Sequence, residues 1–178
     1  QLTSLSTGAS QPVWAPDGKS IAFVSEVFAE YSGLQFGESD SLNRLRLRKA
    51  EQGPVKARVY TQLLYRHWDT WSDLRRRHIF LQPLAGGSPR DLTPGERDAV
   101  PSSSTFSVGV DFDFSPDGSE IACTATPLPT RTEAWSTNHD ILFVPVAGGP
   151  PRQLTTNPAA DGAPRYSPDG KYLAYRAM

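Results

Sequence analysis

The chain has 178 residues, of which 38% are hydrophobic and 21% charged, and its formal net charge is −1 at pH 7. These proportions are typical of a globular domain large enough to bury a core, and the charge gives no electrostatic footprint for nucleic acid or an anionic lipid surface. Cys123 is the single cysteine, which excludes an internal disulfide and a cysteine metal cluster. No stretch approaches the roughly 20 apolar residues that cross a bilayer.

The first recognisable element is a pattern at 12–23 that recurs at 111–123 and 164–175. Each copy has an aromatic residue, a small residue, Pro-Asp-Gly, two polar residues and an apolar run. Proline presets φ for a β-turn, aspartate bonds its own nearby backbone, and glycine adopts a positive φ without steric cost. Each Pro-Asp-Gly is therefore predicted to be a hairpin turn between two strands. The aspartates are interpreted as turn formers rather than catalytic groups: Asp17, Asp117 and Asp169.

The stretch from about 27 to 78 does not continue this pattern and is predicted to be an insertion. Within it, Leu45–Arg48 alternates apolar and basic residues as a strand does, with some likeness to an amphipathic stretch. Val59–Tyr65 is the better candidate for a strand, because it is rich in β-branched and aromatic residues.

The segment that follows, Arg66–Asp73, is dense in functional side chains. His67 with Asp69 and Asp73 suggests metal or acid–base chemistry, but the three histidines of the chain are too scattered for a zinc signature, so no metal or cofactor is expected. Packing is the favoured interpretation of the two tryptophans in the segment. Five residues remain as candidates for binding a substrate: Arg66, His67, Trp68, Asp69 and Trp71.

A guanidinium pairs bidentately with a carboxylate, so the arginines of this region are candidates for binding a substrate carboxylate. Arg66 is a slightly better candidate than the arginine run that follows, since an aromatic residue and a tryptophan flank it. For the run Arg75–Arg77 a solvated basic turn is the preferred interpretation, with a grip on a substrate carboxylate as the alternative.

A second pattern occupies 79–93 and returns at 141–155, with the form Ile-x-x-x-Pro-x-Ala-Gly-Gly-x-Pro-Arg-x-Leu-Thr. Gln1–Thr3 matches its last three residues and resembles the tail of another copy. The Ala-Gly-Gly steps are predicted to be turns, so the repeating unit has four strands. The two Gly-Gly turns lie 62 residues apart and the three Pro-Asp-Gly turns 100 and 52 apart, against about 40–50 for four-stranded blades. The first unit therefore carries a large insertion and the second a modest one.

The fold class predicted from these repeats is all-β, a partial β-propeller of four-stranded antiparallel blades that spans 1–178. It comprises two near-complete blades plus the start of a third. The expected boundaries are about 10–93 with the insertion at about 27–78, about 108–155, and about 162–178. Propellers close with four to eight blades, so we expect a longer polypeptide, and the open blade edges predict possible self-association.

The Pro-Asp-Gly and Gly-Gly-x-Pro-Arg-x-Leu-Thr repeats resemble those of TolB-like proteins and of the prolyl oligopeptidase family of serine peptidases. The segment Tyr65–Trp71, followed by His78–Phe80, resembles the dipeptidyl-peptidase and acylaminoacyl-peptidase branch. This resemblance implies an N-terminal propeller that restricts access of peptide substrates to a C-terminal α/β-hydrolase domain with a Ser-Asp-His triad. It also implies a periplasmic or secreted location, with a cytoplasmic one left open.

The sequence departs from that family in two respects. It contains no Gly-x-Ser-x-Gly nucleophile elbow, so no catalytic residue carries over to this chain. It also lacks an adjacent Glu-Glu pair, which in the proline-specific dipeptidyl peptidases grips the substrate amino terminus. The expected function is therefore a non-catalytic, substrate-gating propeller part whose partners are the hydrolase domain and a peptide. The alternative is a TolB-like propeller that acts as a protein-interaction scaffold. Neither hypothesis involves nucleic acid or a membrane.

Overall fold

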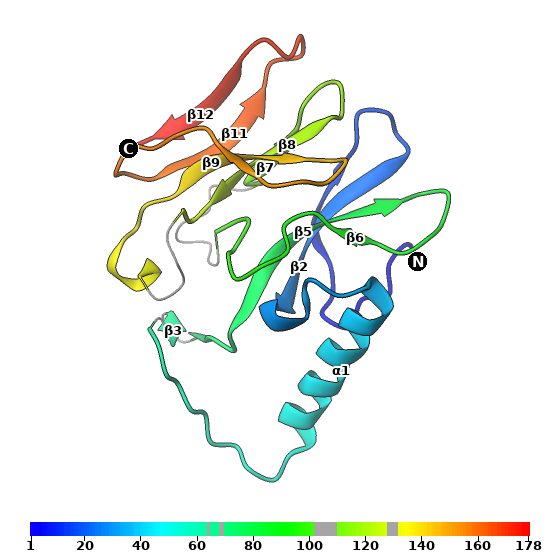
Figure 1. The fold of residues 1–178 in the computed structure, drawn as a ribbon, viewed down its shortest axis with the longest axis vertical. Coiled ribbons are helices and arrows are strands. Elements are labelled where there is room, and N and C mark those ends of the chain that lie inside the picture. The colour runs from blue at the N-terminus through cyan, green and yellow to red at the C-terminus, as the bar shows by residue number, and fades with distance from the viewer. Residues whose placement is uncertain (64, 68–69, 102–109, 128–131) are drawn as a thin grey trace.

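The structure, a computed structural model, describes residues 1–63, 65–67, 70–101, 110–127 and 132–178. Its first antiparallel sheet has the order β1 (Ser10–Trp14), β2 (Ser20–Phe28), β5 (Arg75–Pro83), β6 (Arg90–Asp91). The second repeats that order with β7 (Phe112–Phe114), β8 (Glu120–Ala125), β9 (Asp140–Pro145), β10 (Arg152–Gln153). A third, two-stranded sheet contains β11 (Asp161–Tyr166) and β12 (Leu173–Ala177). The predicted all-β partial propeller is confirmed (Figure 1).

The core lies between successive sheets, because alternate residues of each strand point to opposite faces. Val24 and Ile79 of the first sheet pack with Phe112 and Ile121 of the second in one buried cluster. On the other face of the second sheet, a smaller cluster around Ile141 contacts side chains of the third. Full burial of each such side chain contributes about 1.5–3 kcal/mol, so the second sheet is stabilised by both of its neighbours.

The Pro-Asp-Gly hairpins form as predicted. Gly18, Gly118 and Gly170 have φ of +67°, +72° and +70°, and each donates its N–H to the carbonyl three residues earlier. In each turn the aspartate Oδ1 accepts the N–H of the residue two positions later. Carboxylate and backbone together therefore close the same turn three times.

The Leu-Thr ends of the second pattern fasten the outermost strand of each sheet. The N–H of Ile79 donates to Thr93 Oγ1 at 2.9 Å, and that of Ile141 to Thr155 Oγ1 at 3.0 Å. The preceding leucine in each copy donates its N–H back to the carbonyl of the same isoleucine. The threonine hydroxyl thus replaces a ladder partner where the short outer strand has ended.

The short and the long connections between strands lie at opposite ends of the molecule. Neighbouring strands run in opposite directions, so the tight turns share one end of the sheets and the long connections share the other. Figure 1 shows the helix α1 (Phe36–Gln52), the small hairpin that contains β3 (Arg66–His67) and β4 (Thr70–Trp71), and the long connections gathered away from the Pro-Asp-Gly hairpin tips. We call this end the long-connection face.

The insertion differs from its prediction. The expected strand at Leu45–Arg48 is wrong, because these residues lie within α1, which begins after the short 3-10 helix η1 (Ala29–Tyr31). Residues 44–52 are mostly strong helix formers, and four alternating residues are too few to outweigh them. The expected strand at Val59–Tyr65 is also wrong, because no strand is found there among the described residues. Val59 is 83% exposed. The segment has the composition of a strand, but its described side chains are not buried against a neighbouring element as those of a strand usually are.

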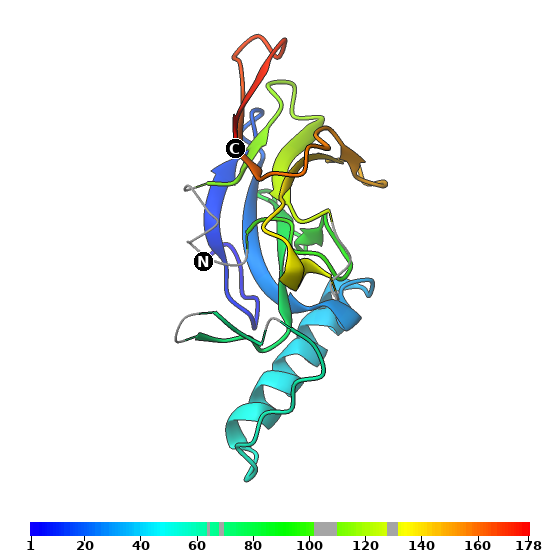
Figure 2. The same cartoon turned by 90° about the vertical axis from the view of Figure 1, so that its left-hand side faces the viewer.

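The first half of α1 is fixed to the first sheet, and the second half extends beyond it (Figure 2). Asn43, which is buried, accepts the N–H of Phe28 at the end of β2 through Oδ1 at 2.9 Å. Asp40 Oδ1 accepts the N–H of Ser6 at 2.7 Å. These polar contacts orient α1, and Phe36 in its first turn packs against the buried cluster of Phe23, Val27 and Phe80.

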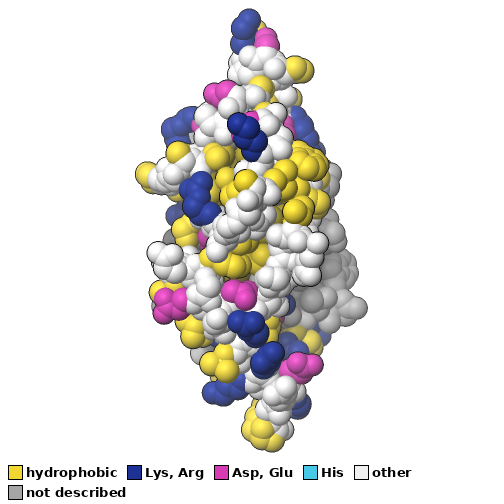
Figure 3. Space-filling model, turned by 90° about the vertical axis from the view of Figure 1, so that its right-hand side faces the viewer, with side chains coloured by type: hydrophobic (Ala, Val, Ile, Leu, Met, Phe, Trp, Pro, Cys, Tyr) yellow, Lys and Arg dark blue, Asp and Glu magenta, His cyan; other side chains and the backbone are white. Residues whose placement is uncertain are grey.

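Figure 3 views the right-hand side of Figure 1 and shows hydrophobic side chains near the middle of that face. Acidic and basic side chains are scattered around them, with both signs interspersed. No helix among the described residues is long and apolar enough to cross a membrane.

Candidate functional site

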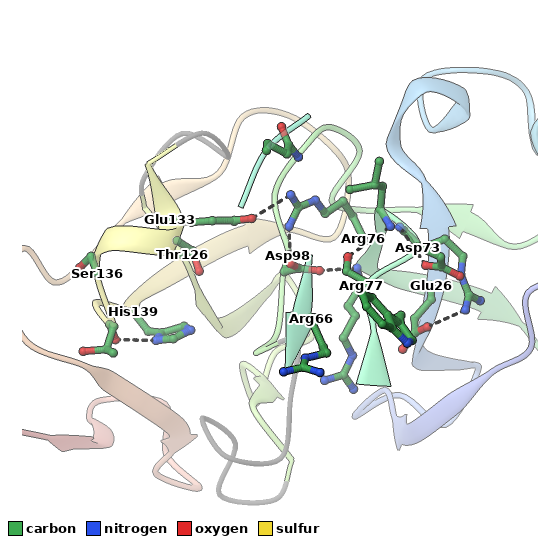
Figure 4. A pocket seen from close by; sticks show the side chains of 16 residues that line it. Glu26, Arg66, Asp73, Arg76, Arg77, Asp98, Thr126, Glu133, Ser136 and His139 are labelled. Carbon is green, nitrogen blue, oxygen red and sulfur yellow. Dashed lines mark hydrogen bonds and ion pairs between the residues drawn. The ribbon is translucent and has the colours of Figure 1, made fainter. Parts of the chain in front are cut away.

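A cleft of about 250 Å³ opens on the long-connection face, between the first and second sheets (Figure 4). The start of β5, the β3–β4 hairpin and the connection between β8 and β9, which includes the 3-10 helix η2 (Glu133–Trp135), supply its walls. The lining contains four arginines: Arg66, Arg75, Arg76 and Arg77. It also contains four carboxylates: Glu26, Asp73, Asp98 and Glu133. How these charges pair decides what the cleft is able to bind.

Arg76 is the centre of a largely buried ion cluster. Its Nη1 lies 2.9 Å from Asp98 Oδ2, and its Nη2 lies 2.9 Å from Glu133 Oε1. Burial acts to lower the pKa of Arg76, but the two carboxylates outweigh that effect and raise it. Burial raises the pKa of Glu133, although Arg76 acts in the opposite direction. The cluster joins β5 of the first sheet to η2, which belongs to the second.

Arg75 is also paired within the chain. Its Nε lies 2.6 Å from Asp73 Oδ2, and its Nη2 lies 3.3 Å from Glu26 Oε2. The interpretation of Arg75–Arg77 as a solvated basic turn is therefore wrong: the three residues begin strand β5, and carboxylates of the same chain take two of them.

Arg77 and Arg66 have different surroundings. Arg77 donates through Nη1 to the carbonyl of Pro101, while its Nε is buried and has no acceptor among the described residues. The guanidinium of Arg66 lies 5.7 Å from the centre of the Trp71 ring. Within the described part of the chain, neither side chain forms an ion pair with a carboxylate.

Trp71 belongs to an exposed aromatic group. Its ring stacks on Tyr60 at 5.9 Å and on Tyr65 at 6.1 Å between centroids. Packing was the expected role of this tryptophan, and it does pack, yet 46% of its surface stays exposed. Such a ring is able to act as a platform at the mouth of the cleft.

The five predicted site residues are placed as follows. Arg66 and Trp71 face each other across the β3–β4 pair and both line the cleft. His67 pairs through its backbone with Thr70. Trp68 and Asp69 lie outside the described residues.

Sequence reasoning missed the roles of Asp98 and Glu133, which contact Arg76 across 22 and 57 residues of chain. No local pattern marks either residue, because only the packing of two sheets brings them together.

Of the other two histidines, His139 lines the cleft, whereas His78 has structural surroundings. His78 is fully buried, with Nδ1 2.7 Å from Asp91 Oδ2 and Nε2 3.0 Å from the carbonyl of Gly95. One ring nitrogen therefore holds β6 and the other holds the segment after it. Among the described residues, no group of three or more His, Cys, Asp or Glu side chains is placed to hold a metal ion.

Comparison with known proteins finds relatives among peptidases. Dipeptidyl-peptidase 5 of Porphyromonas endodontalis is 28% identical over 184 residues, which cover all of this chain and 24% of that protein. Dipeptidyl-peptidase 5 of Porphyromonas gingivalis is 28% identical over 170 residues, covering 93% of this chain and 23% of that protein. The chain therefore spans about a quarter of the length of these relatives. No family model matches it.

Among solved structures, the crystal structure of TolB from Acinetobacter baumannii superimposes with a TM-score of 0.51 at 20% identity. The match covers 96% of this chain and 27% of that one, and at such low identity it shows the fold alone. The expected resemblance to peptidase propellers and to TolB-like repeats is confirmed by these comparisons.

Proposed function

We propose that this chain is part of the propeller of a longer serine peptidase, of the dipeptidyl-peptidase or acylaminoacyl-peptidase type, and controls the access of peptides to the catalytic domain. One observation carries the proposal: the similarity to dipeptidyl-peptidase 5 proteins extends over 93–100% of the chain, which spans about a quarter of their length. The chain itself is proposed to be non-catalytic, since it has no Gly-x-Ser-x-Gly elbow. We propose a periplasmic or secreted location for the parent protein.

The long-connection face is proposed as the side that meets both the substrate and an α/β-hydrolase domain of the same protein. Ligand-binding residues concentrate on long connections held by a rigid scaffold, and the cleft opens on that face. We retain Arg66, His67, Trp68, Asp69 and Trp71 as the proposed substrate contacts. Arg66 and Trp71 support this assignment because they line the cleft.

We propose the blade boundaries given above, namely about 10–93, about 108–155 and about 162–178. β12 pairs only with β11 among the described strands, so its other edge is free to accept a further strand. The next strand of the third blade is the proposed occupant of this edge, and the isolated chain is expected to self-associate there instead.

Labelling of the catalytic serine tests the proposed function. The full-length protein is treated with a fluorophosphonate probe and, in parallel, assayed on chromogenic dipeptidyl and acyl-aminoacyl substrates. We expect stoichiometric labelling of one serine outside this chain, with loss of hydrolysis. Absence of both labelling and hydrolysis would contradict the proposal.

A second candidate is a protein-interaction scaffold, favoured by the likeness of the fold to TolB. This alternative predicts a full-length protein without hydrolase activity that retains a protein partner in affinity capture. Hydrolysis of dipeptidyl substrates by the full-length protein would exclude a pure scaffold.

A further inference from the structure

The lining charges of the cleft are equal in number, but they are paired unevenly. Arg75 forms ion pairs with Asp73 and Glu26. Arg76 forms ion pairs with Asp98 and Glu133. Two of the four lining arginines therefore occupy all four lining carboxylates. Arg66 and Arg77 line the same cleft without an ion-pair partner among the described residues.

We propose that Arg66 and Arg77 form a carboxylate-binding site, and that its ligand is the C-terminal carboxylate of a short peptide. This inference rests on the proposed function, because it names the part of the peptide substrate that the propeller holds. Guanidinium groups bind carboxylates through two parallel charge-assisted hydrogen bonds, so two unpaired arginines in one cleft are suited to this ligand.

Arg77 provides the fixed half of the site. Its backbone N–H donates to Asp98 Oδ1 at 2.7 Å, and its Nη1 donates to the carbonyl of Pro101. Its Nε is buried and has no acceptor in the part of the chain that the structure describes. A partly buried cation without a counter-charge is unfavourable, and an anion in the cleft supplies that charge.

Arg66 provides the accessible half. The β3–β4 pairing sets its backbone opposite Trp71, and the guanidinium lies over the indole ring. The half-exposed Trp71 and Tyr65 offer aromatic surface beside it. A peptide whose carboxylate meets Arg66 is therefore able to rest its last side chain on Trp71.

The size of the cleft favours a peptide end over a longer ligand. Its volume of about 250 Å³ lies below the about 300–1,000 Å³ typical of sites for drug-sized molecules. One or two terminal residues fill such a space. A cleft of this size admits the terminal carboxylate of a peptide more readily than a side-chain carboxylate in the middle of one.

The test compares matched peptides by calorimetry on the full-length protein after fluorophosphonate treatment, so that no peptide is cleaved. The probes are Ala-Ala-Phe as the free acid, its C-terminal amide, and Ala-Glu-Phe amide, whose carboxylate is internal. We expect the free acid to bind wild-type protein about ten-fold more tightly than either amide, which corresponds to about 1.4 kcal/mol. Equal affinity for the free acid and its amide would overturn the proposal. Tighter binding of Ala-Glu-Phe amide than of Ala-Ala-Phe amide, by as much as the free acid gains, would overturn the terminal assignment.

Variants assign the effect to the two arginines. Arg66→Gln and Arg77→Gln should each reduce the acid-to-amide ratio to about two-fold or less, while Lys171→Gln, in the exposed turn of the third Pro-Asp-Gly hairpin, should keep it at about ten-fold. An unchanged ratio in Arg66→Gln, or in a folded Arg77→Gln, would overturn the site. If Arg77→Gln does not fold, the Arg66→Gln result decides. Because binding is measured without turnover, a protein that lacks peptidase activity still gives a result, and failure of the proposed function is separated from failure of the site.

Discussion

Arg76 and Glu133 are 57 residues apart in the chain, and their side chains meet with Nη2 and Oε1 at 2.9 Å. The contact joins the first sheet to the connection between β8 and β9 of the second. Asp98 lies on the other side of the same guanidinium at 2.9 Å. Because the cluster lines the cleft, it fixes the relative position of the two walls that a ligand would contact.

Replacement of Arg76 is expected to destabilise the propeller. Arg76→Met leaves Asp98 and Glu133 without their cation, and their side chains are only 8% and 18% exposed. Removal of one partner of a buried ion pair costs about 3–5 kcal/mol. Urea unfolding of the full-length protein should show a loss of that order. The exposed pair Lys171–Asp169 supplies the control, since Lys171→Met should cost less than about 1 kcal/mol; equal effects of the two variants would contradict the role of Arg76.

Replacement of Glu133 is expected to behave differently and to depend on pH. Burial raises the pKa of Glu133 above its ordinary value of 4.5, so the folded state holds this proton more tightly than the unfolded chain does. As the pH rises through the interval between the two pKa values, ionisation of Glu133 lowers the free energy of unfolding. The glutamine side chain of Glu133→Gln cannot ionise, and Arg76 still forms its ion pair with Asp98 in this variant. Between pH 4 and pH 8, the stability of the variant relative to wild type should therefore increase; a decrease over that range would be incompatible with the raised pKa.

The anchor of α1 gives a third prediction. Asn43→Ala removes the acceptor of the buried Phe28 N–H, and an orphaned buried donor costs about 1–3 kcal/mol. Hydrogen exchange should show faster exchange of the Phe28 amide and of the first turns of α1. Arg44→Ala, at an exposed neighbouring position, should leave both unchanged. Equal protection in Asn43→Ala and wild type would show that Asn43 does not hold the helix.

The hairpin at Asp117 offers a prediction about acid. The hydroxyl of Ser115 and the N–H and hydroxyl of Ser119 hold the pKa of Asp117 at about 2. The stabilisation is present above the ordinary pKa of 3.8 and is lost as the pH falls towards about 2. Ser115→Ala should raise the pKa of Asp117 towards 3.8 in a carboxyl NMR titration. An unshifted titration in this variant would exclude Ser115 as the main cause.

Cys123 is expected to be chemically silent in the folded protein. The residue is 1% exposed, and burial raises the pKa of its thiol to about 12. The thiolate is the reactive form, so a disulfide reagent should label Cys123 only after denaturation. Stoichiometric labelling of Cys123 under native conditions would show that the core between the first two sheets opens.

Sequence patterns predicted the repeated parts of this fold because their chemistry is local. A Pro-Asp-Gly turn contains its own acceptor, its own donor and its own positive φ, so Asp117 and Gly118 indicate a hairpin wherever they occur. The four-residue alternation at Leu45–Arg48 was misleading, because helix propensity acts over the whole of 36–52. Short alternation therefore had less predictive value than the composition of the surrounding segment.

The candidate site was predicted only in part. Arg66 was singled out from its aromatic neighbours, and the structure places it over Trp71 in the cleft. Which arginines remain unpaired depends on Asp98 and Glu133, whose partners are set by packing between sheets. A local sequence pattern does not show which residues of different sheets form ion pairs. Only the structure therefore shows that Arg76 is paired with carboxylates and that Arg77, among the described residues, is not.

The most direct test of the central claim, a propeller that admits peptides to a serine peptidase, measures hydrolysis by the full-length protein on substrates of increasing size. We expect rapid cleavage of tripeptides and tetrapeptides, loss of this activity after fluorophosphonate treatment, and no cleavage of a folded protein such as native lysozyme. We also expect no hydrolysis by the 178-residue chain alone. Failure of the full-length protein to cleave any of the short peptides, or equal cleavage of short peptides and the folded protein, would contradict a gating role for the propeller.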